Sequence, residues 1–600
     1  MPSMTLLCRC VWTACCLVVL TPCSWGADPV VVSAQQQRVA VIEKVAPSVV
    51  AIFAPGGAGG GSGVLISADG FALSNFHVTD GVGDFMKCGL NDGVLYDAVI
   101  VGVDPSGDVA LIKMFGREDF PHAKLGDSDL VQSGDWTFVM GNPFLLATDF
   151  QPTVTYGIVS GVHRYQYPAA GNILEYTDCI QVDTSINPGN SGGPLFNADG
   201  DLIGINGRGS FEKRGRVNSG AGYAISINQI KHFLDHLKSG RIVDHATLGA
   251  TVATDDEGNV TVKDILEDSE AYYRGLRHDD EIVSFGGRSI GSTNQFKNVL
   301  GIYPKGWKLP IVYRRKTEQT EIWVRLRGLH LLSELTGEKK QGPEPQPKPD
   351  EKPRKDEPKD GPKDSQQPKD GKPQPPPMRG HAAPPPPPEH LKKFHVKKTG
   401  YANFYFNQLE QDRVLKGLAT WGSYEEARGR WKLTGKIGEA TKFEATLADS
   451  GAGLFLGKEA FLQEFSDLVE LRDEPPGTGG LLTAWHHLRL LLSKGPKSFT
   501  DFYYLGSEPF DGQGETVDVL VGALAGAESH WYFSRQTGVL LGYDFIRADN
   551  QDRCELRFQG MQDFSGKKFP KVFQIRHADK SPALYQIEAI DFAAPGNDTK

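Results

Sequence analysis

The chain of 600 residues is too long for one hydrophobic core, because folded domains usually contain about 100–200 residues, so we expect about three folded units. It carries 64 Lys and Arg against 74 Asp and Glu, a formal net charge of −10. A mildly acidic chain without a strongly basic block lacks the electrostatic footprint of a nucleic-acid-binding protein, and that class is excluded.

Residues 1–26 have the pattern of a secretory signal peptide. An early Arg9 is followed by an apolar run from Val11 to Leu20 and by Ser24-Trp25-Gly26. The run is shorter than the roughly 20 residues of a membrane-spanning helix. The pattern predicts an exported protein of the periplasm or cell envelope, with an uncleaved leader that anchors the chain in the membrane as the alternative.

The cysteines predict no disulfide framework. Five of the eight lie in the leader, and the remaining three, Cys88, Cys179 and Cys554, are far apart and form no metal-ligand spacing. We expect these three to be buried as small hydrophobic residues.

Residues 39–240 predict a β-rich domain. Short runs of β-branched and aromatic residues alternate with glycine turns, a spacing typical of β-barrels or sandwiches; strands are expected at 49–53, 63–66, 98–101, 110–112 and 136–139. Apolar residues at helical spacing over 228–237 predict the helix that closes this domain.

Residues 246–330 predict a small α+β domain, with strands at 259–262 and 281–285 and a helix at 269–274. Residues 336–393 predict a disordered linker, because 343–390 contain no Val, Ile, Leu, Phe, Tyr or Trp. Its prolines favour a semi-rigid spacer, which at about 3.1 Å per residue would hold the flanking domains up to roughly 150 Å apart.

Residues 394–600 predict a last β-rich, α+β domain, with strands at 429–433, 442–447, 517–521 and 531–533 and a helical stretch at 484–492. The runs 531–543 and 567–570 weakly resemble the strand-turn-strand pattern of LolA-like lipoprotein-carrier half-barrels. That resemblance implies membrane or lipid association through this domain. The whole chain is thus expected to be a mainly β, multidomain protein.

The segment 187–195, Asn-Pro-Gly-Asn-Ser-Gly-Gly-Pro-Leu, carries the strongest chemical signal. Its glycines allow a sharp backbone turn that aims successive amides at one point, since a side chain would obstruct the approach. Ser191 is the candidate nucleophile. Gly189, Asn190 and Ser191 form the candidate oxyanion hole, with the amides of Gly189 and Ser191 as the donors.

His77 and Asp108 complete a candidate catalytic triad. The imidazole of His77 can take the serine proton, and a carboxylate that precedes the apolar run 109–112 can fix its tautomer. Asp104 is the alternative carboxylate, but Asp104-Pro105 is typical of a turn start, which favours Asp108. The chain order His, Asp, Ser is that of chymotrypsin-like double β-barrels.

These three segments, together with 125–128, 140–144, 157–160 and 181–188, resemble the HtrA family of trypsin-fold serine proteases over residues 39–329. The resemblance implies an endopeptidase that cleaves unfolded or damaged exported proteins without ATP, and a homotrimer or a multiple of it. No cofactor and no metal is expected. A proteolytically silent chaperone or peptide-binding scaffold is the alternative function.

The resemblance also assigns binding residues. The loop 247–250 is similar to the carboxylate-binding loop of a PDZ domain, which implies that Leu248, Gly249 and Ala250 receive the C-terminus of an extended peptide. Ser185 stands six residues before Ser191 where a pocket for Lys or Arg would need an aspartate. By similarity, Ser185 with Ile186, Ile205 and Ile225 would form a small apolar specificity pocket instead.

Asn190 stands where trypsin-like zymogens carry the aspartate that pairs with a freed N-terminus. Activation by cleavage is therefore not expected. The resemblance implies a loop rearrangement on ligand binding as the switch.

Overall fold

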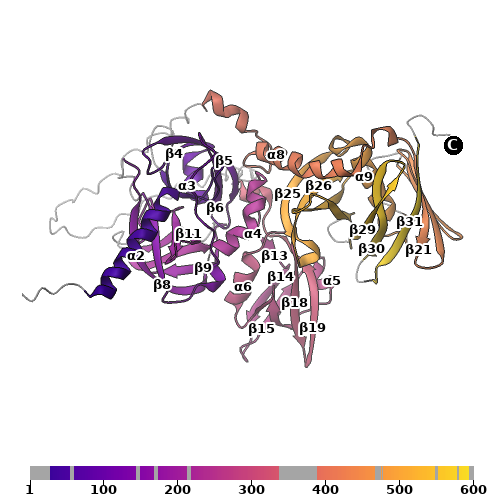
Figure 1. The fold of residues 1–600 in the computed structure, drawn as a ribbon. Coiled ribbons are helices and arrows are strands. Elements are labelled where there is room, and N and C mark those ends of the chain that lie inside the picture. The colour runs from indigo at the N-terminus through magenta and orange to yellow at the C-terminus, as the bar shows by residue number, and fades with distance from the viewer. Residues whose placement is uncertain are drawn as a thin grey trace, which may run out of the picture.

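The computed structural model describes residues 28–54, 60–142, 149–167, 173–211, 218–336, 388–465, 475, 477–547, 552–577 and 580–593. The expected signal peptide and nearly all of the expected linker lie outside these residues. Among the described residues, no helix combines the length and the apolar character that a membrane crossing requires. The architecture is mainly β and multidomain, as predicted (Figure 1).

Two closed six-stranded antiparallel barrels form the N-terminal part. The first contains β1 (Val49–Phe53), β2 (Gly60–Leu65), β3 (Phe71–Ser74), β4 (Phe85–Gly89), β5 (Leu95–Asp104) and β6 (Val109–Phe115). The second contains β7 (Trp136–Gly141), β8 (Thr153–Gln166), β9 (Tyr176–Val182), β10 (Pro194–Asn197), β11 (Leu202–Phe211) and β12 (Asn218–Ser226). Every strand expected in this part coincides with or overlaps an observed one.

Three helices accompany the barrels: α2 (Pro29–Val45), α3 (Phe76–Val82) and α4 (Ile227–Lys238). The predicted closing helix is α4, and it buries Ile230, Phe233 and Leu237 in one core with residues of both barrels, among them Val101 and Phe138. This shared core fixes the two barrels relative to each other, so side chains on their seam have defined positions.

The second unit is a six-stranded antiparallel sheet covered by short helices. Its elements are β14 (Ala250–Thr254), β15 (Val260–Ile265), α5 (Glu270–Tyr273), β16 (Glu281–Phe285), β17 (Arg288–Ser289), α6 (Thr293–Gly301), β18 (Lys308–Arg315) and β19 (Glu318–Arg325). A small pair, β13 (Ala246–Thr247) and β20 (Arg327–Gly328), closes its base, and α7 (Leu332–Leu335) follows. Strand β14 lies at the edge of the sheet, so its outer backbone groups can accept a further strand.

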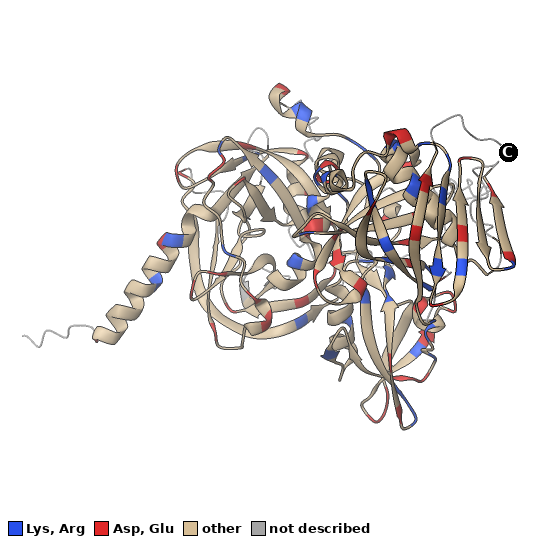
Figure 2. Ribbon diagram, turned by 45° about the vertical axis from the view of Figure 1, so that its right-hand side comes forward, with Lys and Arg blue, Asp and Glu red and all other residues tan. Residues whose placement is uncertain are grey.

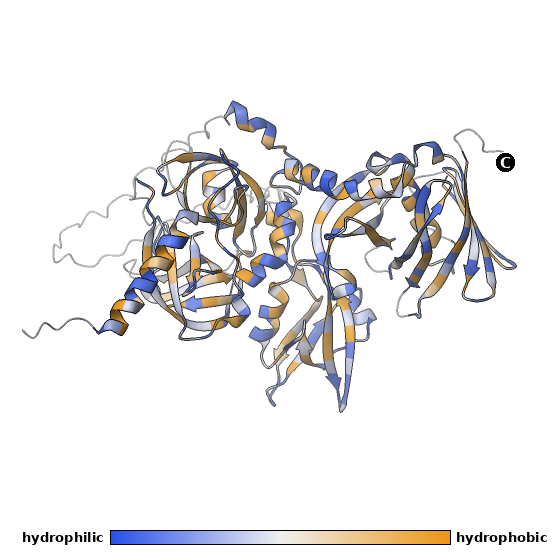
Figure 3. Ribbon diagram, viewed as in Figure 1, coloured by the Kyte–Doolittle hydropathy of each residue, from blue (hydrophilic) through white to orange (hydrophobic). Residues whose placement is uncertain are grey.

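The C-terminal unit is one open antiparallel sheet of eleven strands. In spatial order these are β24 (Glu459–Glu464), β23 (Gly451–Leu456), β22 (Thr441–Leu447), β21 (Trp431–Ile437), β31 (Ala583–Phe592), β30 (Lys567–His577), β29 (Cys554–Phe564), β28 (Leu540–Ile546), β27 (Ala527–Ser534), β26 (Thr516–Leu524) and β25 (Asp501–Pro509). Hydrophobic and hydrophilic residues alternate along its strands (Figure 3), which buries one face, and the two signs of charge are interspersed over it (Figure 2).

Helix α9 (Leu481–Lys494) packs against this sheet and is buried on all sides. It packs with large aromatic residues, including Trp431, Trp485 and Trp531, into the main core of the unit. The expected helical stretch 484–492 is therefore an internal helix. Its paired histidines, His486 and His487, are core residues, and burial lowers the pKa of His487 to about 3. The three free cysteines are also buried, as predicted.

The C-terminal unit does not stand apart from the others, contrary to the expected spacer. Its first elements, η4 (Glu389–Phe394) and α8 (Phe404–Leu415), run along the first barrel and α4 (Figure 1). Phe394 stacks on Phe115 with ring centroids 4.5 Å apart, and Phe406 lies in the core that the barrels share. The linker sequence shows only that 343–390 cannot form a core, whereas the aromatic residues that follow bring the chain back to the barrels.

A buried ionic network joins the second unit to the C-terminal sheet. Arg325, whose side chain is 7% exposed, contacts Glu508 at 3.1 Å and the fully buried Asp544 at 3.3 Å. Asp544 also pairs with Arg557 at 2.9 Å. Burial alone would raise the pKa of Asp544, but these arginines outweigh it and hold the pKa well below its usual value. The network is charged at neutral pH.

We expect Arg325→Ala to destabilise the junction by about 3–5 kcal/mol, because it leaves the buried Glu508 without its cation and removes one of the cations that face Asp544. Guanidinium unfolding followed by tryptophan fluorescence would measure the loss. The control is Lys432→Ala, whose pair with Glu444 is 41% and 42% exposed and which should cost no more than about 1 kcal/mol. Equal losses in both variants would contradict this account.

Candidate active site

His77 lies in the first turn of α3, on the rim of the first barrel. Its ring Nδ1 is 2.8 Å from Asp108 Oδ2 and its backbone N–H donates to Asp108 Oδ1 at 3.0 Å. About half of the His77 side chain is exposed, while Asp108 is buried. A histidine held on one edge by a buried carboxylate keeps its other nitrogen, Nε2, available to a ligand.

The backbone at Asp108 has an unusual conformation and is held by two hydrogen bonds to its carbonyl. Asp108 adopts a positive φ of 57°, and its carbonyl accepts hydrogen bonds from the Asn75 side chain at 2.9 Å and from the Phe76 N–H at 3.2 Å. The turn between β5 and β6 and the start of α3 are thereby tied together. This arrangement brings His77 and Asp108 into contact, as the sequence predicted.

Tyr176, on β9 of the second barrel, also donates to the Asp108 carboxylate, with 2.5 Å between the oxygens. Gly207 lies beside this ring, and a Cβ at that position would come within 2.5 Å of it. Sequence reasoning did not identify Tyr176, because nothing in 176–182 marks the tyrosine as different from any other buried strand residue. It is the second barrel's contribution to the carboxylate.

The environment of His77 sets its proton affinity. Burial alone would lower the pKa of His77, but the hydrogen bond and the negative charge of Asp108 outweigh burial, and the pKa is raised above its ordinary value of about 6.5. The imidazole is therefore a stronger base than a free histidine.

Ser191 lies in the turn before β10, docked against the first barrel. Its carbonyl accepts the Ser62 N–H at 3.0 Å, and the Ser62 hydroxyl donates to the Gly189 carbonyl at 2.6 Å. Gly192 has a φ of 83°, and a Cβ there would approach the Ser62 carbonyl to 2.3 Å. The glycine is required because the turn passes directly over β2.

The hydroxyl of Ser191 donates to the Gly207 carbonyl at 3.4 Å. Within the described residues, no hydrogen bond joins Ser191 to His77. The structure thus brings the Ser191 turn and the His77–Asp108 pair to the same seam, with the hydroxyl turned toward β11.

The backbone N–H groups of the turn differ in whether they donate a hydrogen bond. The N–H of Asn190 donates to the Asn187 carbonyl at 2.9 Å, whereas no described acceptor takes the N–H of Gly189 or of Ser191. The Asn190 side chain is buried without a hydrogen-bond partner. Two unengaged amides that flank a third are the arrangement that an incoming oxyanion requires.

The four residues expected to form the specificity pocket do not lie together. Ile186 packs inside the second barrel with Val182 and Leu195. Ile205 and Ile225 are paired neighbours on β11 and β12, but they face the shared core with α4. Ser185 accepts a hydrogen bond from Thr155 through its carbonyl. Ser185 and Ile186 precede the Ser191 turn outside any strand, so their orientation follows from the loop, whereas Ile205 and Ile225 take theirs from the strands they lie on.

Asp104, the alternative carboxylate, has a separate partner. It accepts the Gly107 N–H at 2.8 Å, as a turn start does, and its other oxygen lies 2.7 Å from His245 Nε2. The second ring nitrogen of His245 is 2.8 Å from the carbonyl of Gly301, at the end of α6. Burial alone would lower the pKa of His245, but Asp104 raises it. His245 therefore connects α6 with the turn that carries Asp108.

The loop before β14 has the backbone that a carboxylate-binding loop needs. Leu248 is buried in the core of the second unit, Gly249 has a φ of 72°, and Ala250 begins β14. A Cβ on Gly249 would lie 2.7 Å from the Cβ of Ser269. Helix α6 lies along the same sheet, and the Thr254 and Thr293 hydroxyls bridge it to β14 at 3.3 Å.

The chain is similar to known trypsin-like peptidases. A model of the trypsin-like peptidase domain matches residues 61–205. The probable periplasmic serine endoprotease DegP-like of Chlamydia trachomatis serovar D is 34% identical over 297 residues, which cover 48% of this chain and 57% of the relative. The periplasmic serine endoprotease DegP of Escherichia coli K12 is 34% identical over 279 residues, which cover 44% and 56%.

A solved structure, the HtrA-type protease AlgW with a tripeptide, matches 48% of this chain and 96% of its own at 30% identity and a TM-score of 0.40. The chain spans just over half the length of the curated relatives it matches. Two closed barrels with His77, Asp108 and the Ser191 turn on their seam define a domain of the trypsin-like peptidase class. Within that class, the curated relatives that the chain resembles are named as periplasmic serine endoproteases of the DegP type.

We expect the His77 imidazole to titrate above its ordinary pKa, and Asp108→Asn to bring the pKa below that value, because burial then acts unopposed. NMR titration of the ring protons, performed in a Ser191→Ala background, would measure both. Tyr176→Phe is the control, since it removes a hydroxyl from Asp108 but keeps the charge, and its His77 pKa should stay raised. A native His77 that titrates below 6.5 would contradict the assignment of Asp108 as its partner.

Proposed function

We propose that the chain is an exported serine endopeptidase of the HtrA type, with Ser191 as the nucleophile, His77 as the general base and acid, and Asp108 as the residue that orients His77. The contact that carries the proposal is the 2.8 Å pair between His77 and the buried Asp108, facing the Ser191 turn across the barrel seam.

The chemistry follows from these groups. Ser191 Oγ attacks the peptide carbonyl while His77 Nε2 takes its proton, and the imidazolium formed is stabilised by Asp108. The amides of Gly189 and Ser191 receive the negative oxygen of the tetrahedral intermediate, and Asn190, between them, holds the turn. His77 then donates the proton to the leaving amine. Because the neutral base is required, the rate should rise as pH increases through the raised pKa of His77.

The orientation of Ser191 is part of the proposal. Its hydroxyl must leave the Gly207 carbonyl and rotate toward His77 before it can attack. Rotation about one side-chain bond crosses between staggered wells and moves no backbone. We propose that substrate supplies this change by taking the Gly207 carbonyl into an extended pairing with β11.

The substrates proposed are unfolded or damaged polypeptides of the periplasm. The support is the sequence similarity to relatives that are described as periplasmic serine endoproteases. The alternative of a proteolytically silent scaffold has one observation in its favour, the hydrogen bond of Ser191 to Gly207 in place of His77. The two functions are separated by assaying turnover.

We propose that the second unit is a PDZ-like domain in which Leu248, Gly249 and Ala250 receive a peptide C-terminus and the peptide adds as a strand to β14. The support is the free edge of β14, the αL glycine before it and α6 alongside.

Two further expectations accompany the proposal. A homotrimer, or a multiple of it, is the assembly that the family resemblance implies, and Val30 and Val31 on α2, which are 74% and 57% exposed, offer apolar surface for it. Lipid association of the C-terminal unit stays a prediction from the sequence. Its concave side holds α9 and an aromatic core, where a carrier would need room for acyl chains.

Ser191→Ala should lower the turnover of unfolded casein by at least about 10⁴-fold, because the nucleophile is lost while the fold remains. The rate of casein cleavage by the purified full chain, with thermal unfolding to confirm an intact fold, measures the effect. Ser133→Ala, an exposed turn serine, should retain native turnover. Equal turnover by the native chain and Ser191→Ala would rule out this mechanism.

A peptide with a free C-terminal carboxylate should bind the Ser191→Ala chain at least about tenfold more tightly than the same peptide with an amidated end, since the loop amides need a charged acceptor. Isothermal titration calorimetry would measure the difference. Gly249→Ala should remove it, because its Cβ collides with Ser269, whereas Gly258→Ala, where a Cβ meets nothing within 4 Å, should retain it. Identical affinities for both peptides would exclude the PDZ-like role.

A further inference from the structure

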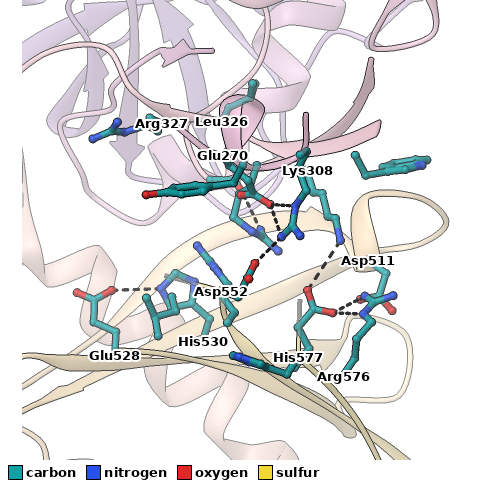
Figure 4. A pocket seen from close by; sticks show the side chains of 18 of the residues that line it. Glu270, Lys308, Leu326, Arg327, Asp511, Glu528, His530, Asp552, Arg576 and His577 are labelled. Atoms are coloured by element: carbon teal, nitrogen blue, oxygen red, sulfur yellow. Dashed lines mark hydrogen bonds and ion pairs between the residues drawn. The ribbon is translucent and has the colours of Figure 1, made fainter. Parts of the chain in front are cut away.

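A large cleft lies between the second unit and the C-terminal sheet, away from the His77 site. It encloses about 1460 Å³ and is lined by residues of β18 to β20 on one side and of β25 and β27 to β30 on the other. In Figure 4, Glu270 and Lys308 project from the second unit toward the side of the cleft where His530, His577 and Arg576 of the sheet lie. Arg241, which follows α4, also lines it, so all three folded units contribute.

The charge of the lining is predominantly positive. Ten Lys or Arg side chains line the cleft against six Asp or Glu side chains, and seven of the ten are arginines. Two of these charges are matched across the cleft, since Arg274 pairs with Asp552 and Lys308 lies 3.8 Å from Glu555. Other lining arginines have carboxylate partners too, such as Arg327 with Asp268 and Arg576 with Glu555. Among the described residues, Arg241 and Arg547 have no ion-pair partner.

Three of the remaining lining groups lack hydrogen-bond partners. Arg553 Nη1, His530 Nδ1 and His577 Nδ1 are buried atoms without one among the described residues. Arg553 Nη1 lies 3.5 Å from Asp544, but that carboxylate also serves Arg325 and Arg557, and the contact is not aligned as a hydrogen bond. Of these three atoms, Arg553 Nη1 is a donor in every protonation state of the cleft, and native proteins rarely leave a buried donor unsatisfied. Arg553 therefore marks this wall of the cleft as a site for an acceptor.

Two further arginines add positive charge to this side of the cleft. Arg547 is half-buried and has no ion-pair partner among the described residues. Arg241 is stacked over Tyr503 at 4.8 Å, which fixes its plane while leaving its donors free of a carboxylate. Glu528 lies 3.3 Å from His530 Nε2, while Arg553 shares the carboxylate of Asp544 with Arg325 and Arg557.

We propose that this cleft binds a ligand that carries a phosphate group. Guanidinium groups present paired donors that match phosphate oxygens, and arginines predominate here over lysines. The volume exceeds that of a phosphate, so the group is expected on a larger polar body that also meets the rings of Tyr273 and Trp323. The site is separate from the proposed peptidase centre and does not depend on its activity.

The test uses the full-length chain with Ser191→Ala, so that it proceeds whether or not the chain is a peptidase. Inorganic phosphate and glycerol 3-phosphate represent a soluble source of the group, and short-chain phosphatidylglycerol below its micellar concentration represents a lipid headgroup. Calorimetric titration at constant ionic strength, with glycerol as the uncharged probe, gives the affinities. Saturable binding of at least one phosphate probe, and none of glycerol, is expected.

Arg547→Gln and Arg553→Gln should each weaken that binding at least tenfold. Lys432→Gln, which removes the same charge from β21 outside the cleft lining, should leave it unchanged. Should Arg553→Gln fail to fold, Arg547→Gln decides, because among the described residues its side chain has no ion-pair partner to lose. The proposal is overturned if no phosphate probe binds saturably, or if the cleft variants bind as tightly as the Lys432→Gln control.

Discussion

The buried carboxylate of Asp108 is the constraint on which the proposed active site depends. A charge removed from water needs several donors, and here they come from both barrels: the backbone and ring of His77 from one, the hydroxyl of Tyr176 from the other. Satisfying one acid therefore aligns the seam on which the Ser191 turn also docks. Active-site geometry and barrel packing have the same physical cause.

Much of this arrangement could be predicted from the sequence. The glycines around Ser191, the His77 segment and the preference for Asp108 over Asp104 rest on local rules of turns and chain order, and the structure brings these residues to one seam. Tyr176 and the positions of Ile186, Ile205 and Ile225 could not be predicted so well. For Tyr176, Ile205 and Ile225 this depends on which face of a barrel strand points inward, and a one-residue change of register reverses that face, while Ile186 lies in the loop before the Ser191 turn.

The relation between the folded units was the largest departure from expectation. A proline-rich segment without hydrophobic residues indicates that it cannot fold by itself, but it says nothing about whether its neighbours touch. The contacts that bring them together lie elsewhere. Phe394 packs on Phe115, and Ser507, in β25, accepts hydrogen bonds from His236 of α4 and Trp307 of the second unit. Arg325 adds charge pairing to the same junction.

The docked junction has a consequence for the chain between Leu335 and Glu389. Leu335, before that stretch, is buried, and Leu391, just after it, lies in the core that the barrels share. Because loop-closure entropy grows only with the logarithm of length, each doubling of the connecting stretch should cost the assembled units only about 0.6 kcal/mol.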